Sequence, residues 1–232
     1  MIERFDPDRI VVLNRDDDGI LTSKPIELGD DLKPKRYRQQ RRQFAEAVLA
    51  RGVLVVEGAT EVATFLAIAD ALDADPATAY QHPDVAGLSL FDAGSDKDVP
   101  QYGPIFAALG KAVFGVHDTP TTPLTPEQLT KAQLFTIHTD IGYAGIEALL
   151  VEEILPSVQR KVLVAVAART DYPAQCGLLP EPASDDQVRD LTQEILKKRK
   201  GPNRTPPCSL PSAIVPNSQR PWSRCCSTST NA

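Results

Sequence analysis

The chain has 232 residues, of which 42% are hydrophobic, and its formal net charge is −6. This length and composition predict a globular protein with one sizeable domain plus flanking segments. No stretch approaches the roughly 18 uninterrupted apolar residues that a transmembrane helix needs, and the charged start MIERFDPDR is unlike a secretory signal. We therefore expect a cytoplasmic protein with no membrane partner. The four cysteines show neither zinc-ligand spacing nor a disulfide framework.

The first part of the chain alternates between expected strands and helices. Residues 9–22 are typical of a hairpin with an Asp-Gly turn, 35–50 of a helix, 53–56 of a strand, and 60–72 of a helix capped by Thr60. A second strand should end at Phe91 or Asp92 and a third at Asp118, on either side of a helix that Gly110 stops. A fourth short strand is expected at 133–138, after a loop rich in proline and threonine. This alternation predicts an α/β fold with a mainly parallel sheet of about four strands flanked by helices.

The later part of the chain predicts a small helical region. GIEALLVEEIL, SVQRKVLVAVAAR and SDDQVRDLTQEILKKRK have helical patterns, and SDDQ resembles a capping box. Residues 162–167 could equally form a strand, because periodicity cannot decide so short a run. From Gly201 onward the chain has six prolines, six serines and no acidic residue, which predicts disorder. A shifted reading frame or a truncated end would also account for this composition.

Carboxylates follow two of the expected strands. Glu57 comes directly after the apolar run VLVV, and Asp118 follows AVFGVH. Glu61 lies one helical turn after Glu57, and Gly58 between them allows the backbone to turn closely. Ligand sites of open parallel sheets lie beyond the carboxyl ends of the strands, and carboxylates that converge there suit hard cations such as Mg²⁺. The alternative is that these glutamates are ordinary solvated or helix-capping residues.

The order of these elements, with EGATE after the first strand of the sheet and FDAGSD after the second, resembles the TOPRIM domain of topoisomerases, primases and related nucleases. More closely, RQFAEAVLARGVLVVEGATEVATF and HTDIGYAGIEALLVEE resemble the nuclease half of the OLD (overcoming lysogenisation defect) endonucleases. This resemblance covers about residues 9–200. It implies a DNA nuclease that depends on Mg²⁺ or Mn²⁺, with two ions acting on the phosphodiester.

The resemblance also implies roles for single residues. It makes Glu57 and Glu61 ligands of one ion, and Asp118 and Glu147 ligands of the other. It places a lysine near the phosphate, for which Lys200 is the best candidate and Lys197 and Lys198 are rivals. The alternative for this basic run is a solvated helix end that the helix dipole favours.

Two positions depart from the OLD pattern. Pro120 stands where a second aspartate is expected, and Gly145 stands where a serine is usual. One ion would then be held weakly, unless His117 or Asp140 substitutes. Asp92 also ends a strand and is a further contributor at most.

A basic stretch, KPKRYRQQRR at 33–42, contrasts with the acidic chain around it, and clustered basic residues of this kind favour contact with DNA phosphates. The alternative is a solvated helix face. The predicted DNA-binding residues are Lys33, Lys35, Arg36, Arg38, Arg41 and Arg42.

The sequence has no phosphate-binding loop of the form GxxxxGK[ST], so we expect no ATP site in this chain. An OLD protein would have an ATPase module, which the resemblance leaves as a missing or separate partner; a homodimer also stays open. We expect an N-terminal hairpin at 1–32 as the remnant of that module, a TOPRIM domain at 33–140, a helical extension at 141–200 and a disordered tail at 201–232.

Two other functions compete with a nuclease. A catalytically impaired TOPRIM fragment could act as a binding or dimerisation module or have no function, which Pro120 and the abrupt tail favour. A topoisomerase or primase fragment is a further alternative, but those enzymes need more domains, and GYAGIEALLVEE does not suggest them.

Overall fold

The computed structural model describes residue 6 and residues 9–15, 18–28, 34–170 and 172–198. These residues divide into two compact units. The first unit contains the described residues up to Gly58 together with Pro83–Asp140, and the second contains Ala59–His82 together with the described residues from Ile141 onward. The predicted tail at 201–232, Lys200 and Lys33 lie outside the described residues, and so do the side chains of Pro34 and Arg36.

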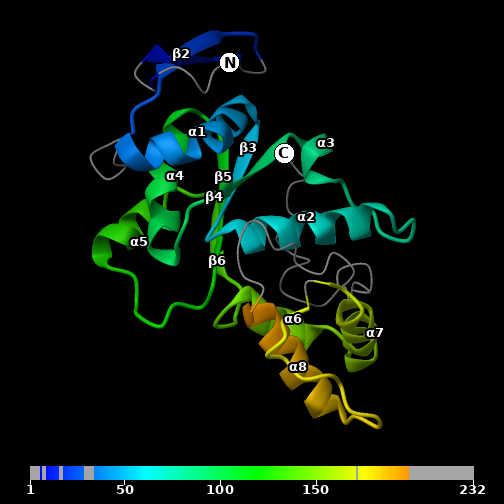
Figure 1. The fold of residues 1–232 in the computed structure, drawn as a ribbon. Helices are drawn as coiled ribbons and strands as arrows, with labels where there is room; N and C mark the ends of the chain where they lie inside the picture. The colour runs from blue at the N-terminus through cyan, green and yellow to red at the C-terminus, as the bar shows by residue number, and fades with distance from the viewer. Residues whose placement is uncertain (1–5, 7–8, 16–17, 29–33, 171, 199–232) are drawn as a thin grey trace. The chain divides into compact units, whose positions relative to one another are not determined.

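A four-stranded parallel sheet forms the centre of the first unit, in the order β4-β3-β5-β6 (Figure 1). β3 (Gly52–Val56) pairs with β4 (Leu88–Asp92) on one side and with β5 (Ala112–His117) on the other, and β5 pairs with β6 (Ile137–Asp140). Four of the five residues of β3 are buried, which is why its sequence GVLVV is apolar throughout rather than alternating. The predicted α/β fold with a parallel sheet is confirmed.

An aromatic core packs on one face of this sheet. Helices α1 (Pro34–Leu49), α4 (Val99–Ala108) and α5 (Pro126–Ala132) lie on the same side of the strands (Figure 1). Phe44 of α1 and Phe106 of α4 have ring centroids 5.4 Å apart, and Phe91 of β4 and Tyr102 of α4 have centroids 4.6 Å apart. Burial of each such side chain stabilises the fold by about 1.5–3 kcal/mol, so these rings supply much of the first unit's stability.

The predicted N-terminal hairpin is present and continues to Pro25. β1 (Val11–Arg15) pairs antiparallel with β2 (Leu21–Pro25) as a separate two-stranded sheet. Gly19 in the turn has φ of 81°, a value that glycine adopts without strain. The side-chain amide of Asn14 donates a hydrogen bond to the carbonyl of Leu109 at 2.8 Å, which ties the hairpin to the end of α4.

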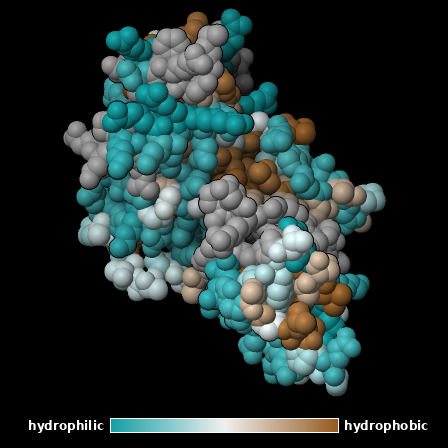
Figure 2. Space-filling view, in the orientation of Figure 1, coloured by the Kyte–Doolittle hydropathy of each residue, from teal (hydrophilic) through white to brown (hydrophobic). Residues whose placement is uncertain are grey.

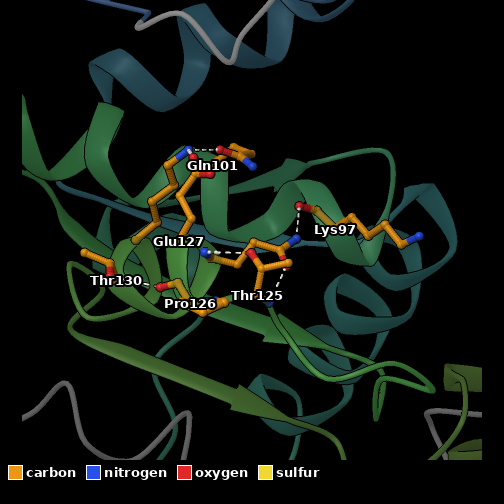
Figure 3. A network of polar contacts seen from close by, with 8 residues as sticks. Lys97, Gln101, Thr125, Pro126, Glu127 and Thr130 are labelled. Carbon is orange, nitrogen blue, oxygen red and sulfur yellow. Dashed lines mark hydrogen bonds and ion pairs between the residues drawn. The ribbon is translucent and has the colours of Figure 1, made fainter.

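α5 occupies part of the segment that the sequence predicted as a loop, so that prediction was wrong over 126–132. Its first turn is a capping box: the N–H of Gln128 donates to Oγ1 of Thr125 at 3.2 Å, and the N–H of Thr125 donates to Oε1 of Gln128 at 2.9 Å. Nζ of Lys131 donates to Oε1 of Gln101 on α4 at 2.6 Å and to Oε1 of Glu127 at 2.8 Å (Figure 3). The missed signal was TPEQ, a capping-box pattern with proline at the first helical position.

The second unit is helical. It contains α2 (Ala59–Asp73), α6 (Ile146–Glu153), α7 (Pro156–Ala167) and α8 (Asp185–Lys198). The side-chain amide of Gln159, fully buried on α7, donates to the carbonyls of Val151 and Ile154 at 2.7 Å each, which satisfies the end of α6. Ser184 and Gln187 form the predicted capping box of α8, and residues 162–167 belong to α7, which rules out a strand there.

The remaining elements are short, and two predicted boundaries were wrong. α3 (Pro83–Ala86) and the 3₁₀ turn η3 (Asp96–Asp98) precede β4 and α4 respectively. α2 begins at Ala59, so Thr60 lies inside the helix and is not its N-cap. The fourth strand runs from Ile137 to Asp140 rather than over 133–138, because hydrogen-bonded turns follow α5 as far as Phe135. None of the described helices is long and apolar enough to cross a bilayer.

Gly103 lies where α4 packs closely against Phe135, in the segment after α5. A Cβ at this position would lie 2.2 Å from Cε2 of Phe135 and 3.1 Å from the carbonyl oxygen of Lys131. Alanine normally stabilises a helix interior relative to glycine by about 0.5–1 kcal/mol. Because of the overlap, we expect Gly103→Ala to lower the free energy of unfolding by about 1–3 kcal/mol, measured by urea denaturation.

Gly177→Ala is the matched control for this substitution. No heavy atom lies within 4 Å of a Cβ built on Gly177, so we expect a change of less than about 0.5 kcal/mol. A Gly103→Ala protein as stable as its parent would show that the contact with Phe135 relaxes freely.

Candidate functional site

Each strand of the parallel sheet leads into an acidic residue at its carboxyl end. Asp92 ends β4 and Asp140 ends β6, while Glu57 and Asp118 directly follow β3 and β5. The strand register pairs Val56 with Asp92 and His117 with Asp140, so the four strands finish at nearly the same level. Since the carboxyl edge of a parallel sheet is where such folds bind ligands, this edge is the candidate site of the first unit.

Glu57 and Asp118 are in direct contact at this edge. The backbone N–H of Asp118 donates a hydrogen bond to Oε1 of Glu57 at 2.5 Å. Both residues are half-buried. A carboxylate that accepts a backbone N–H forms a charge-assisted hydrogen bond, which is stronger and more directional than a neutral one. The contact therefore fixes the Glu57 side chain against the end of β5.

His117 holds the other side of the Asp118 backbone. Its Nδ1 lies 2.7 Å from the carbonyl oxygen of Asp118, and because a carbonyl only accepts, Nδ1 is the donor. The His117 ring is buried and lies 4.7 Å, centroid to centroid, from the ring of His138 on β6. Burial, and in second place the neighbouring His117, lowers the pKa of His138 from its ordinary 6.5 to about 4. His138 is therefore neutral near pH 7.

The acidic residues of the two outer strands have other partners. Oδ1 of Asp92 accepts the N–H of Gly94 at 2.8 Å, while its backbone N–H and carbonyl are bonded by the side chains of Gln43 and Gln40. Asp140 is exposed, and its Oδ1 accepts the hydroxyl of Thr119 at 3.1 Å. The sequence predicted Asp140 only as a substitute ligand. Its position beside the end of β5 follows from the pairing of β5 with β6.

The other predicted ligands belong to the second unit. Glu61 lies in the first turn of α2, two residues after that helix begins, and is partly exposed. Glu147 lies in the first turn of α6 and is only 6% exposed. The structure therefore brings Glu57 and Asp118 together in the first unit, while the roles of Glu61 and Glu147 stay predictions.

Residues 34–42 of the predicted DNA-binding stretch form the N-terminal half of α1, and Figure 2 shows this part of the surface as hydrophilic. Lys35 and Arg38 are exposed. Nη2 of Arg41 lies 3.7 Å from Oδ1 of Asp6, and the guanidinium group of Arg41 lies over the ring of Tyr37. Nε of Arg42 donates to Oε1 of Glu46 at 3.0 Å. Arg41 and Arg42 thus have acidic partners within the chain, whereas no ion pair involves Lys35 or Arg38 in the described part of the chain.

Two of the three lysines predicted to contact the phosphate lie at the end of α8. Lys197 and Lys198 are exposed in the last turn of α8, where basic side chains favourably oppose the helix dipole. This is the position that the solvated-terminus alternative requires.

Residues 48–119 match the family model described as "Overcoming lysogenization defect protein-like, TOPRIM domain". This part of the chain is an OLD-like TOPRIM domain. The match contains Glu57, Glu61 and Asp118, whereas Glu147 and Lys200 lie beyond its end. No curated protein matches the chain.

TOPRIM is a fold of metal-binding nucleases and primases. The question is therefore whether the residues at the carboxyl edge of the sheet suit a divalent cation. Within the described ranges, no group of three or more His, Cys, Asp or Glu side chains is arranged to hold a metal ion. The pair formed by Glu57 and the end of β5 nevertheless supplies the right chemistry, since hard cations take carboxylate oxygens and keep several waters. Glu57 and Asp118 therefore offer carboxylate oxygens of the kind that such an ion takes.

The lowered pKa of His138 predicts how the stability of the TOPRIM domain depends on pH. Well above pH 6.5 His138 is neutral in both the folded and the unfolded chain. Between pH 6.5 and about 4 the unfolded chain binds the proton more readily, so the free energy of unfolding should fall as the pH falls through this range. We expect His138→Asn, measured by urea denaturation at pH 7 and pH 5, to lose less stability than the wild type.

The carboxyl groups titrate in both proteins, so the difference between the two profiles isolates His138. Parallel profiles would contradict the lowered pKa.

Proposed function

We propose that this protein is a DNA nuclease that depends on Mg²⁺ or Mn²⁺ and whose metal centre is built on Glu57 and Asp118. The observation that carries this proposal is the hydrogen bond between the Asp118 N–H and the Glu57 carboxylate, inside the matched TOPRIM segment. It holds one carboxylate beside another acidic residue at the ligand-binding edge of the sheet. Two acidic side chains at one edge repel each other, and a bound cation would offset that repulsion.

The resemblance to the OLD endonucleases implies a role for each of the predicted site residues. Glu57 and Asp118 would each hold an ion, with Glu61 and Glu147 as the remaining predicted ligands. A bound divalent ion would polarise the phosphodiester and lower the pKa of a water molecule. Lys200, or Lys197 or Lys198 in its place, would offset negative charge on the phosphate.

A catalytically impaired TOPRIM module is the second candidate, and one observation favours it. Pro120 follows Asp118 and Thr119 at the position where the OLD pattern has a second aspartate, and proline offers no ligand atom in its side chain. Such a protein would bind a metal ion weakly and would bind DNA or a second subunit without cutting DNA.

Glu57→Gln tests the metal centre with the smallest change of shape. The amide can still accept the Asp118 N–H but carries no charge. Residues that only orient metal ligands change activity by about 10–100-fold when replaced, so loss of a ligand charge should reduce Mn²⁺-dependent nicking of supercoiled plasmid by more than about 100-fold. Glu27→Gln, which removes an exposed charge from the first unit, should leave nicking unchanged.

Three outcomes separate the candidates. Nicking that requires Mg²⁺ or Mn²⁺ and that Glu57→Gln removes supports the nuclease. Binding of Mn²⁺ by calorimetry without nicking supports the impaired module. Nicking at the wild-type rate by Glu57→Gln shows that the proposed metal centre is wrong.

Lys35→Gln/Arg38→Gln tests whether α1 binds DNA. These two side chains are exposed. Each lost contact between a basic side chain and a DNA phosphate should reduce the slope of log affinity against log salt concentration by about 0.9. We expect a slope shallower by about 1–2 in fluorescence-anisotropy titrations. Lys97→Gln/Lys161→Gln removes two exposed charges elsewhere and is the control. Equal slopes for all three proteins would mean that α1 is a solvated face.

A further inference from the structure

Both polar backbone groups of Asp118 are held by side chains. Its N–H donates to Oε1 of Glu57 at 2.5 Å, and its carbonyl oxygen accepts Nδ1–H of His117 at 2.7 Å. At the end of a strand these groups usually turn to water, because the ladder partner is no longer there. Fixing the groups on either side of the Asp118 Cα restricts both of its backbone dihedrals. The direction in which the Asp118 side chain leaves the backbone is therefore set.

The His117 ring that makes one of these bonds packs against the ring of His138. Its ring lies 4.7 Å from that of His138, and the His138 ring lies 5.0 Å from that of Phe135 at an angle of 65°. His117 is 7% exposed and Phe135 is 8% exposed. The three rings form a continuous stack, which we name the histidine stack, between the hydrophobic core and the candidate site.

Gly115 makes room for the histidine stack. It is the β5 residue paired with His138 in the register, and it lies two residues before His117, on the same face of the strand. A Cβ on Gly115 would be 2.8 Å from Cδ2 of His138 and 2.8 Å from Cε1 of Phe135. Any side chain at this position would displace the two rings that support His117.

We propose that His117 is a positioning residue that locks the Asp118 backbone and thereby holds the Glu57 carboxylate in place. The histidine stack fixes the ring, the ring fixes the Asp118 carbonyl, and the Asp118 N–H fixes the Glu57 carboxylate. The consequence for metal binding rests on the proposed function. The lock itself does not, because it consists only of contacts within the chain.

Two substitutions of His117 separate its hydrogen bond from its packing. His117→Asn keeps a donor near the position of Nδ1, while His117→Phe keeps a ring in the stack and removes the donor. The first measurement is amide hydrogen exchange by NMR at Asp118, with the amide of Val55 in β3 as the internal reference. We expect exchange at Asp118 to be about fivefold faster in His117→Phe and within about twofold of wild type in His117→Asn.

The second measurement is Mn²⁺ affinity by calorimetry. We expect His117→Phe to weaken binding about 5–10-fold and His117→Asn to bind within about twofold of wild type. A role in packing alone would make the asparagine variant the worse of the two, since it removes a ring from the stack. That order of affinities, or exchange at Asp118 that His117→Phe leaves unchanged, would overturn the inference.

The wild-type protein provides a readout that needs no variant to fold. The ¹⁵N chemical shifts of His117 distinguish a protonated Nδ1 from one that carries a lone pair, and the inference requires a protonated Nδ1. A lone pair on Nδ1 would overturn it. If the wild type binds no Mn²⁺ but shows the expected shifts and exchange, the lock stands and the proposed metal centre fails.

Discussion

The parallel pairing of β3 with a strand on each side is the feature that creates the candidate site. It brings the carboxyl ends of β4, β3 and β5 to one edge, and the strand that pairs with β5 adds a fourth. Because β3 is buried, its own side chains have to be apolar, and a carboxylate can appear only where the strand ends. Glu57 stands at that point. The sheet thus confines charged side chains to the ends of its strands, and the carboxyl ends form the edge at which such folds bind ligands.

α1 links the core, the sheet edge and the surface. Its inward side supplies Phe44 to the aromatic core, and Gln40 and Gln43 bond the backbone of Asp92 at the end of β4. Oε1 of Gln40 also accepts the hydroxyl of the buried Tyr102 at 2.6 Å, so that the hydroxyl is not left unsatisfied inside the core. Packing and hydrogen bonds on the inward side of α1 therefore fix the position of the helix that carries the exposed basic residues.

The end of β5 combines an unusual set of residues. A buried histidine stands before Asp118 and a proline two residues after it. Pro120 has no backbone donor and no carboxylate, and the side chains of Glu57 and His117 hold the backbone of Asp118. The neighbouring strand end contributes Asp140, whose Oδ1 accepts the hydroxyl of Thr119.

Local sequence patterns were enough to predict the fold class and the main candidate residues. Apolar strands that end in acids, helices between them and the EGATE motif predicted the parallel sheet with Glu57 and Asp118 at its edge, because strand order and hydrophobic burial leave local marks. Which side chains touch became visible only in the folded chain. The Asp118 N–H on Glu57, the stack of His117 on His138, and the partners of Arg41 and Arg42 join residues by pairing and packing across the fold or across a helix turn. Local patterns predict an i,i+4 pair such as Arg42–Glu46, but they do not predict the contacts between strands. Gly115 and His138, for example, are neighbours only through the register of β5 and β6, which forms when the whole sheet assembles.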